Sequence, residues 1–584
     1  MSSPHQETPQ LGGDLAQGID QNLFQEGRIT KKDNDSGKPK DGPAEILMGM
    51  IRERYDIHRA EDGSPFLTSK RGATHLAALL SDGAEELEGE LADVYYSKVG
   101  KLISDTALRA CTKSVLGAAR KHPKEKVFLR VAQKNGVLWV DRGDPCGQVV
   151  RFSGGSWSLA PTADVCFRRT PLTAELPCPA SQGSIDELWR FMNVAPKDRD
   201  LLIGCLVAAY LPDMAHPIVV MSGEQGTAKS SNGRRFLDLT DPSSAGLRTV
   251  PKEDDWVVTA SNAWVIGIDN ISRIPTWFSD ALCRAVTGEA DVRRKHYTNT
   301  GISVVSFHRQ LLLTGIDLGE LRSDLAERIV SFNLSRISTK KRMDEEDLQK
   351  RWEIARPSIL AALFDLVAIA HETSDAVELA DLPRMAKFAK VLKALDNFRG
   401  TDSLSRYLEK LRELSETVLA SNPFVEELRA RITSFSGTSK ELLTKLDGYS
   451  TGRRLPRNWP QRPAEVTEIL RRFAPPLRDA GWVLEDEGSR NQHKTIRWWI
   501  ESPTAQPPPT SAQPPPTSAP ESASTVAYRI RNHVTLGELL DDQPPAFKTA
   551  GVTGVTGTDS PKTTTGKAHI SEELANQILK GLRS

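Results

Sequence analysis

Residues 223–230 read Gly-Glu-Gln-Gly-Thr-Ala-Lys-Ser, a combination that could bind a nucleoside triphosphate. A triphosphate needs several backbone N–H donors, a lysine that reaches the outer phosphates and a hydroxyl for a metal ion, all at the positive end of a helix. The strict pattern has glycine before the lysine, where this chain has Ala228, so by itself the stretch also fits a chance glycine-rich turn. The residues expected to contact the nucleotide are Gly223, Glu224, Gln225, Gly226, Thr227, Ala228, Lys229, Ser230 and Ser231.

Polar side chains at the ends of two later strands would complete such a site. Asp269 follows a short apolar run and could hold Mg²⁺ together with Ser230, although an Asp-Asn pair after a strand is also a common turn. Thr314 follows another apolar run and is a candidate sensor of the γ-phosphate or of the attacking water. Asn270 stands where many ring ATPases carry a glutamate that activates water, so either another acid does this or hydrolysis is slow.

Two arginines further along the chain could act on a nucleotide bound by a neighbouring copy. Arg328 is the first candidate for an arginine finger, which stabilises the charge that develops in the transition state, and Arg322 is the second. A single arginine is more often the partner in a surface salt bridge, so either assignment depends on the whole array. An arginine that acts in trans requires a ring, or at least a dimer, of identical subunits.

The loop has the flanking elements that such a site needs. Residues 216–221 form an apolar run rich in β-branched side chains, which predicts a buried strand, and residues 231–239 fit a helix. Strands at residues 263–268 and 310–314 alternate with helical segments, as is typical of a parallel α/β sheet. We therefore expect a multidomain α/β protein whose core is a phosphate-loop NTPase.

The order of loop, Asp-Asn strand, polar sensor and arginine resembles the AAA+ core of superfamily-3 helicases encoded by phages, plasmids and integrated elements. Residues 277–284, Trp-Phe-Ser-Asp-Ala-Leu-Cys-Arg, are similar to a group of actinobacterial and phage ATP-binding proteins described as primase- or helicase-like. The resemblance covers residues 126–337 and resumes near Pro423. The sensor of that group is generally asparagine, so water positioning by Thr314 is expected to differ. The resemblance implies ATP and Mg²⁺ as cofactors, and catalytic roles for Lys229, Asp269, Asn270, Thr314 and Arg328.

Residues 293–305 read as a β-hairpin between the Asp-Asn strand and the sensor strand. In superfamily-3 helicases a hairpin in this interval lines the central pore and grips the nucleic-acid backbone, independently of sequence and sensitively to salt. Each side chain taken singly fits a solvated charged hairpin as well. By position, the residues that resemble the grip are Arg293, Arg294, Lys295 and His296.

The segment after Pro423 predicts two helices followed by a two-stranded wing. Thr438 and Glu441 form a capping box at the start of the first helix, residues 466–473 form the second, and residues 481–484 and 495–500 form the wing. This order resembles a winged-helix domain, which binds DNA or docks on proteins. The phosphate-facing candidates are Arg453, Arg454, Arg457, Arg471, Arg472, Arg490 and Lys494.

Pattern and composition divide the remainder of the chain. The helical spacing of Leu76, Leu79 and Leu80 predicts a helical region, short alternating runs after residue 126 predict a β-meander, and repeated Gln-Pro-Pro-Pro predicts a linker. The predicted units are a disordered tail at 1–45, a helical region at 46–126, a β-meander at 127–184, the AAA+ core with a leading helix (185–210) at 185–340, a helical region at 341–422, the winged-helix-like unit at 423–501, a proline-rich linker at 502–526 and a mostly disordered tail at 527–584.

Composition fits a soluble, cytoplasmic protein, with 39% hydrophobic and 26% charged residues, no apolar run long enough to cross a bilayer and no secretory signal. The 76 Lys and Arg residues balance 76 Asp and Glu residues, so contact with nucleic acid must come from a local basic stripe. Six cysteines without a Cys-x-x-Cys pair suggest neither a zinc site nor a disulfide framework.

These expectations combine into one function and two alternatives. We expect an ATP hydrolase that acts as a ring-shaped DNA helicase or translocase on single-stranded or forked DNA during replication of a phage, plasmid or integrated element. Any primase would be a separate chain, because no cluster of carboxylates suits a polymerase-type metal site. The alternatives are a nucleotide-gated DNA-binding scaffold and a defence-associated ATPase without unwinding activity.

Overall fold

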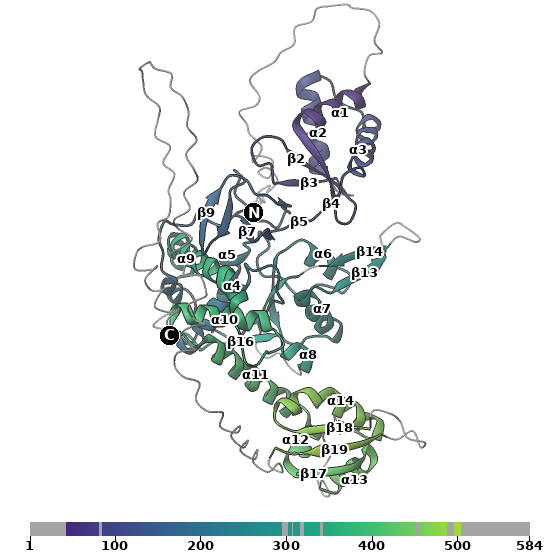
Figure 1. Cartoon of the computed structure of the whole chain (residues 1–584), viewed down its shortest axis with the longest axis vertical. Coiled ribbons are helices and arrows are strands. Elements are labelled where there is room, and N and C mark those ends of the chain that lie inside the picture. Colours follow the sequence, from purple (N-terminus) through teal and green to yellow (C-terminus); the bar gives the residue numbers. More distant parts are fainter. Residues whose placement is uncertain are drawn as a thin grey trace, which may run out of the picture.

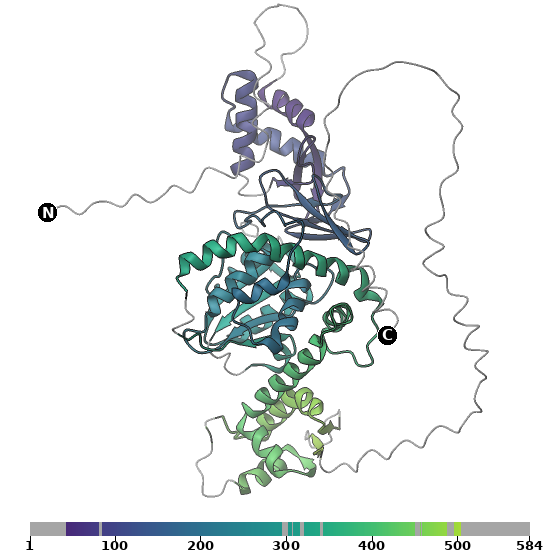
Figure 2. The same ribbon diagram turned by 90° about the vertical axis from the view of Figure 1, so that its left-hand side faces the viewer.

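The computed structural model describes residues 42–80, 85–294, 302–306, 308–315, 321–338, 343–449, 456, 458–487 and 496–503. These residues form an elongated molecule with a parallel-sheet core in the middle (Figures 1 and 2). An N-terminal α/β unit lies at one end of the core, and a C-terminal unit of helices and short strands lies at the other. The predicted tails and the linker lie outside the described residues, apart from residues 42–45, 502 and 503.

The core sheet contains four parallel strands in the order β12-β15-β11-β16. Parallel strands buried on both faces need apolar side chains at successive positions, and β11 has them: Val219 and Met221 join one apolar cluster, whereas Ile218 and Val220 join another. The prediction of a parallel α/β sheet is therefore confirmed. The strands are β11 (Ile218–Ser222), β12 (Val265–Ile271), β15 (Gln310–Gly315) and β16 (Ile329–Asn333).

Helices cover both faces of this sheet. One apolar cluster joins a sheet face to α4 (Arg199–Ala208), α5 (Lys229–Thr240), α9 (Glu345–Thr373) and α10 (Ala386–Arg399). The other cluster joins the opposite face to α6 (Trp256–Ser261), α7 (Thr276–Thr287) and α8 (Ser323–Ala326). The long helix α11 (Ser403–Ala420) contributes Tyr407 to the first cluster and Leu419 to the second. Helices α9, α10 and α11, with the short 3-10 turn η5 (Ser374–Ala376), confirm the predicted helical region after the core.

Helix α9 differs from the expectation that no segment could cross a bilayer. By length and composition alone, residues 345–376 would pass as a membrane span, but 61% of the apolar window is buried inside the protein. The helix packs against α4, the 3-10 helix η2 (Ile185–Arg190) and the strands β8 (Val149–Ser153) and β9 (Ser156–Ala160). Figure 2 shows it crossing the core from side to side. These contacts are those of a core helix.

The spacing of leucines had predicted a helical N-terminal unit, but this unit also contains a sheet. Strands β1 (Tyr55–Ala60) and β2 (Pro65–Ser69) form a hairpin, and the sheet has the order β3-β2-β1-β4. Leu79 lies in a strand, where it pairs with Phe66 of the neighbouring strand. The prediction failed because three leucines are too few to distinguish the spacing of a helix from that of a short strand. The other elements are α1 (Pro43–Arg54), β3 (Ala77–Leu79), α2 (Glu85–Val99), α3 (Asp105–Ala119) and β4 (Lys124–Glu125).

The predicted β-meander is confirmed as an antiparallel sheet of order β6-β7-β8-β9. Arg130 anchors it to the core, because its Nε donates to Asp241 Oδ1 over 2.8 Å while its side chain is almost fully buried. Asp241 ends α5 and also accepts the N–H groups of Trp264 and Val265, where β12 begins. The strands are β6 (Val131–Lys134), β7 (Val137–Asp141), β8 (Val149–Ser153) and β9 (Ser156–Ala160), and beside them β5 (Val127–Phe128) pairs with β10 (Cys166–Phe167).

The predicted leading helix at residues 185–210 is broken. Two 3-10 helices, η2 (Ile185–Arg190) and η3 (Pro196–Asp198), precede α4. Residues 191–195 between them are not helical, and Pro196, which has no N–H and disfavours the helical conformation in Ala195, begins η3. The break places Asn193 in a loop, where its backbone N–H bonds to Asn232 of α5.

The C-terminal unit contains the predicted helices and wing. Its sheet has the order β17-β19-β18, and the sequence did not predict β17. The capping box is confirmed, because Thr438 N–H donates to Glu441 Oε2 over 2.7 Å and Glu441 N–H donates to Thr438 Oγ1 over 3.3 Å. The elements are α12 (Pro423–Arg431), β17 (Ser434–Thr438), α13 (Ser439–Tyr449), α14 (Pro463–Asp479), β18 (Val483–Asp486) and β19 (Arg497–Glu501).

Candidate functional site

The glycine loop at residues 223–230 joins β11 to α5, as the sequence predicted. Gly223 has φ +146°, and a Cβ there would lie 2.7 Å from the carbonyl oxygen of Leu334, so only glycine fits. Gly226, at φ +83°, also adopts a conformation that favours glycine. Thr227 is buried and its hydroxyl donates to the carbonyl of Glu224 over 2.9 Å. The loop is therefore a tight, internally bonded turn.

Ala228 adopts the left-handed conformation, with φ +61° and ψ +35°. This is the position where the strict phosphate-loop pattern has glycine. For a residue with a Cβ this conformation costs about 1–2 kcal/mol. Alanine in place of glycine is a small change in volume, but it puts strain on the backbone at this position. Contacts around Ala228 must therefore stabilise the left-handed conformation by a comparable free energy.

Replacing Ala228 by glycine is expected to remove the strain. Glycine loses more chain entropy on folding, about 0.4–1 kcal/mol, so the net gain in the free energy of unfolding is about 0.5–1 kcal/mol. Thermal unfolding of Ala228→Gly and of the unsubstituted chain would measure the shift. A lowered unfolding temperature would contradict this account of the loop.

Lys229 begins α5 and folds back over the loop. Its ammonium donates to the carbonyl oxygens of Gly223 and Glu224, both over 2.8 Å. The side chain is half-buried, so the charge is held at the loop instead of extending into solvent. A cation fixed beside a glycine loop at a helix N-terminus favours an anionic ligand.

Three polar side chains meet beside Lys229. Ser230 Oγ lies 2.9 Å from Asp269 Oδ1 and 3.2 Å from its Oδ2. The hydroxyl of Thr314 donates to Asp269 Oδ1 and accepts the N–H of Asn270 over 3.1 Å. The contact follows from topology, since β15 lies between β11 and β12 and the carboxyl ends of parallel strands meet at one edge.

This cluster fits Mg²⁺ in combination with phosphate oxygens. Carboxylate and hydroxyl oxygens are hard ligands of the kind that Mg²⁺ takes, usually one or two from the protein with water and phosphate completing the shell. Within the described ranges, no group of three or more His, Cys, Asp or Glu residues could hold a metal ion unaided. The donor set at Ser230 and Asp269 is thus the one expected for a nucleotide-bound metal.

Asn270 follows Asp269 in a local irregularity of β12. The pairing with β15 shifts register between Ile268 and Ile271, and Asn270 has φ +56° and an exposed side chain. The left-handed conformation is one that asparagine tolerates better than most residues. An amide at this exposed position has no basic group with which to activate water.

The two candidate arginines differ sharply in exposure. Arg328 is buried, and its Nη1 donates to the carbonyl and carboxylate of Asp324, with 2.6 Å to Oδ1. In this conformation Arg328 does not reach outward, so its role as a finger toward a neighbouring copy stays a prediction. Arg322 keeps 42% of its side chain exposed while bonding to Asp280 Oδ1 over 2.6 Å. Exposure therefore favours Arg322.

The predicted hairpin is confirmed as the antiparallel pair β13 (Ala290–Arg294) and β14 (Ile302–Ser306). Figure 1 shows it projecting from the core beside α7. Arg293 and Arg294 occupy the last two positions of β13, opposite Ser303 and Ile302. Lys295 and His296 lie outside the described residues.

In the C-terminal unit, Arg471 and Arg472 lie exposed on α14. Arg471 pairs with Asp486 over 3.1 Å. The carbonyl of Arg472 accepts the hydroxyl of Ser323 on α8, so α14 contacts the core at this point. The remaining candidates, Arg453, Arg454, Arg457, Arg490 and Lys494, lie outside the described residues.

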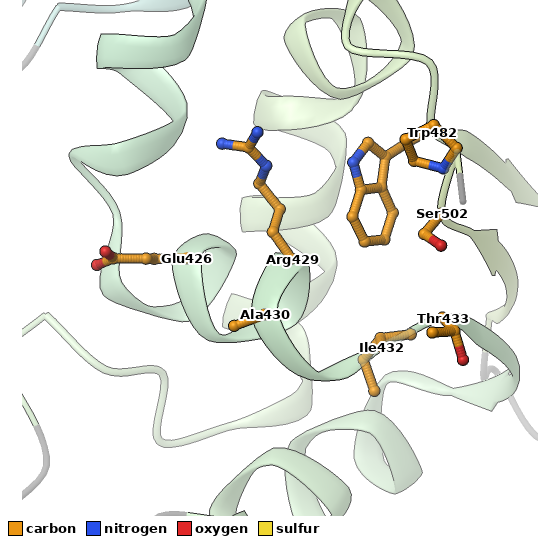
Figure 3. A pocket seen from close by; sticks show the side chains of 8 residues that line it. Glu426, Arg429, Ala430, Ile432, Thr433, Trp482 and Ser502 are labelled. Atoms are coloured by element: carbon orange, nitrogen blue, oxygen red, sulfur yellow. The ribbon is translucent and has the colours of Figure 1, made fainter. Parts of the chain in front are cut away.

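A groove of about 500 Å³ lies in the C-terminal unit, away from the glycine loop (Figure 3). Arg429 and Trp482 face it from α12 and from the turn before β18. Arg429 is already paired with Glu416 over 2.8 Å. The lining residues are Glu426, Arg429, Ala430, Ile432, Thr433, Trp482, Ser502 and Pro503, and none of them was a predicted site residue.

Two asparagines at the loop were not predicted from sequence. Asn232, inside α5, donates its side-chain amide to the carbonyl of Ala228 over 2.7 Å. Asn193, in the break before α4, donates its backbone N–H to Asn232 Oδ1 over 2.8 Å. Pattern alone could have shown Asn232 as a polar residue on the buried face of a helix, but nothing in the sequence places Asn193 beside it.

Comparison with known proteins adds two family matches. Residues 185–417 match the family described as actinomycete integrative conjugative element replication protein. Residues 423–513 match the RepA C-terminal domain of the same elements, and this second match begins where α12 begins. No curated protein gives a significant sequence match.

Among solved structures, the apo form of the NrS-1 C-terminal region is similar at 12% identity and a TM-score of 0.34, covering 79% of this chain and all of that one. A likeness at this TM-score is too weak to support an inference.

The described residues thus form a multidomain α/β protein that carries a glycine loop at the carboxyl edge of a parallel sheet. Two consecutive family matches together span more than half of the 584 residues. Over residues 185–417 and 423–513 the chain matches the replication proteins of actinomycete integrative conjugative elements, the RepA family.

Proposed function

We propose that the chain is an ATP-hydrolysing DNA helicase or translocase of AAA+ type that acts in replication of an integrative conjugative element. The observation that carries the proposal is the meeting of Ser230, Asp269 and Thr314 beside the glycine loop and Lys229. A turn that arose by chance has no reason to bring a helix hydroxyl, a strand-end carboxylate and a neighbouring strand's hydroxyl within hydrogen-bond distance.

Each part of the site then has a role in handling ATP. The loop and the N-terminus of α5 bind the phosphates, and Lys229 moves its ammonium from the loop carbonyls to the outer phosphates. Ser230 and Asp269 hold Mg²⁺, which would neutralise charge on the phosphate oxygens. Thr314 keeps Asp269 oriented and orders water at the same edge. Arg322, being half-exposed, acts on the nucleotide of a neighbouring subunit in a ring.

DNA contact is assigned to two surfaces. The hairpin β13–β14 projects from the core, and Arg293 and Arg294 at the end of strand β13 would grip the backbone of a single strand. The order of α12, β17, α13, α14, β18 and β19 supports a winged-helix domain in which α14 presents Arg471 and Arg472 to phosphates. Both contacts are independent of base sequence.

The exposed amide at Asn270 favours a second function. Without an acid at this position, hydrolysis is slow, and nucleotide would gate DNA binding or assembly and not drive movement. In that case the chain is a scaffold at the origin of replication or in a defence assembly.

Turnover of ATP with and without single-stranded DNA distinguishes these functions. A translocase is expected to hydrolyse ATP several-fold faster with DNA, and its DNA affinity should fall by an order of magnitude or more between about 50 and about 200 mM salt. ATP-dependent separation of a forked duplex would exclude the scaffold function. Unchanged turnover together with an intact fork would exclude the translocase.

A further inference from the structure

Asn232 makes an unusual pair of contacts with the strained residue of the loop. The carbonyl of Ala228 accepts the backbone N–H of Asn232 over 2.9 Å, as expected for the first bond of α5, and also its side-chain Nδ2 over 2.7 Å. Asn232 is 1% exposed. A buried side-chain amide is thus committed to one carbonyl, that of the residue in the left-handed conformation.

The orientation of the Asn232 amide is itself fixed. Asn193 donates its backbone N–H to Asn232 Oδ1 over 2.8 Å, and because an N–H can only donate, the other end of the amide must be the NH₂ group that faces Ala228. The side chain of Asn193 in turn donates to the carbonyl of Ser335, just after β16, over 2.5 Å. The amide is therefore held from a segment outside the loop and outside α5.

Fixing this carbonyl also fixes a donor. The peptide group between Ala228 and Lys229 is planar and trans, so its C=O and N–H point in opposite directions. With the carbonyl turned toward Asn232 inside the protein, the N–H of Lys229 points away from it. This N–H belongs to the first turn of α5, where helix N–H groups lack helical partners and bind anions.

We propose that Asn232, oriented by Asn193, is a positioning residue that holds Ala228 in the left-handed conformation and thereby aims the N–H of Lys229 at a nucleotide phosphate. The inference rests on the proposed binding of ATP at this loop. In a loop with glycine at this position the conformation needs no such support, because glycine adopts it without a Cβ penalty. The asparagine pair compensates for the alanine.

A double substitution tests this dependence. Asn232→Ala is expected to weaken binding of ATP with Mg²⁺ about tenfold, measured by titration calorimetry, since it removes the buried hydrogen bond that holds the carbonyl of Ala228, together with the one from Asn193, and releases the strain at Ala228. Adding Ala228→Gly should return the affinity to within about twofold of that of Ala228→Gly alone. A residue that only packs in α5 would not be rescued by a change in the loop backbone.

The matched control is Asn262→Ala. Asn262 also donates its side-chain amide to the carbonyl four residues before it, that of Val258, over 2.8 Å, but it ends α6. Its removal should leave ATP affinity unchanged. Should Asn232→Ala fail to fold, Asn232→Leu keeps a side chain of similar volume without adding charge but removes the donor to Ala228, and the same loss and rescue are expected.

Three outcomes overturn the proposal: normal ATP affinity in both Asn232 variants, a loss that Ala228→Gly does not rescue, or an equal loss in Asn262→Ala. The failure of the proposed function has a different signature, because the unsubstituted chain would then show no binding of ATP with Mg²⁺.

Discussion

Replacing Lys229 by alanine is expected to weaken ATP binding about 100-fold and to bring hydrolysis below detection. The ammonium is the one cation that the structure holds on the loop carbonyls of Gly223 and Glu224 among the described residues, and a charge-assisted bond to phosphate is worth roughly 1.5–3 kcal/mol before its effect on the transition state. Fluorescent-nucleotide titration and phosphate release measure the two effects separately.

Lys387→Ala is the matched control for this substitution. Lys387 also donates its ammonium to a backbone carbonyl, that of Asp213, over 2.7 Å, but it lies on α10. Both variants lose one lysine and its ammonium bonds to backbone carbonyls, two at Lys229 and one at Lys387. Equal nucleotide affinity in Lys229→Ala and Lys387→Ala would remove the glycine loop from consideration as the ATP site.

Substituting Asp269 by asparagine is expected to slow hydrolysis by a factor on the order of 100 to 1,000 while ATP binding changes little. Asparagine keeps an oxygen that accepts from Ser230 and Thr314, so the local hydrogen bonds survive. What is lost is the negative charge that would hold the metal ion. Turnover measured over a range of Mg²⁺ concentrations should show a large rise in the concentration needed for half-maximal rate.

Asp365→Asn serves as the control for the charge change. Asp365 accepts the indole N–H of Trp157 over 2.8 Å, and asparagine can keep that bond as well. Burial raises the pKa of the Asp365 carboxyl, because the charged form is disfavoured inside the protein. The substitution removes that charge, so its effect on the free energy of unfolding is measured as well. Hydrolysis by Asp365→Asn should equal that of the unsubstituted chain. A normal rate of ATP hydrolysis in Asp269→Asn would contradict the assignment of Asp269 to a Mg²⁺ site.

Much of the core was predictable because the signals were local. The loop follows a run of buried β-branched residues, and its glycines adopt backbone conformations that other residues avoid. The sequence pattern therefore located both β11 and the start of α5. The strands that carry Asp269 and Thr314 were equally clear from their apolar runs. Their contact with Ser230 then follows from the rule that carboxyl ends of parallel strands share one edge.

The misses come from contacts between residues far apart in the chain. Asn193 reaches Asn232 only because the predicted leading helix is interrupted at residues 191–195, and local pattern gave no reason to pair two polar residues 39 positions apart. Arg328 was preferred over Arg322 by its place in a motif, whereas burial against Asp324 is decided by tertiary packing. Strand β3 was missed because the spacing of Leu76, Leu79 and Leu80 fits a helix as well as a short strand.

Helix α8 is a single turn of four residues, Ser323–Ala326, with Arg322 directly before it and Arg328 two residues after it. Its Ser323 bonds to Arg472 of α14, and Leu325 and Ala326 belong to the same apolar cluster as Leu470 and Phe473. An element this short has no length over which to bend. This single turn therefore joins the C-terminal unit directly to the segment that carries both arginines.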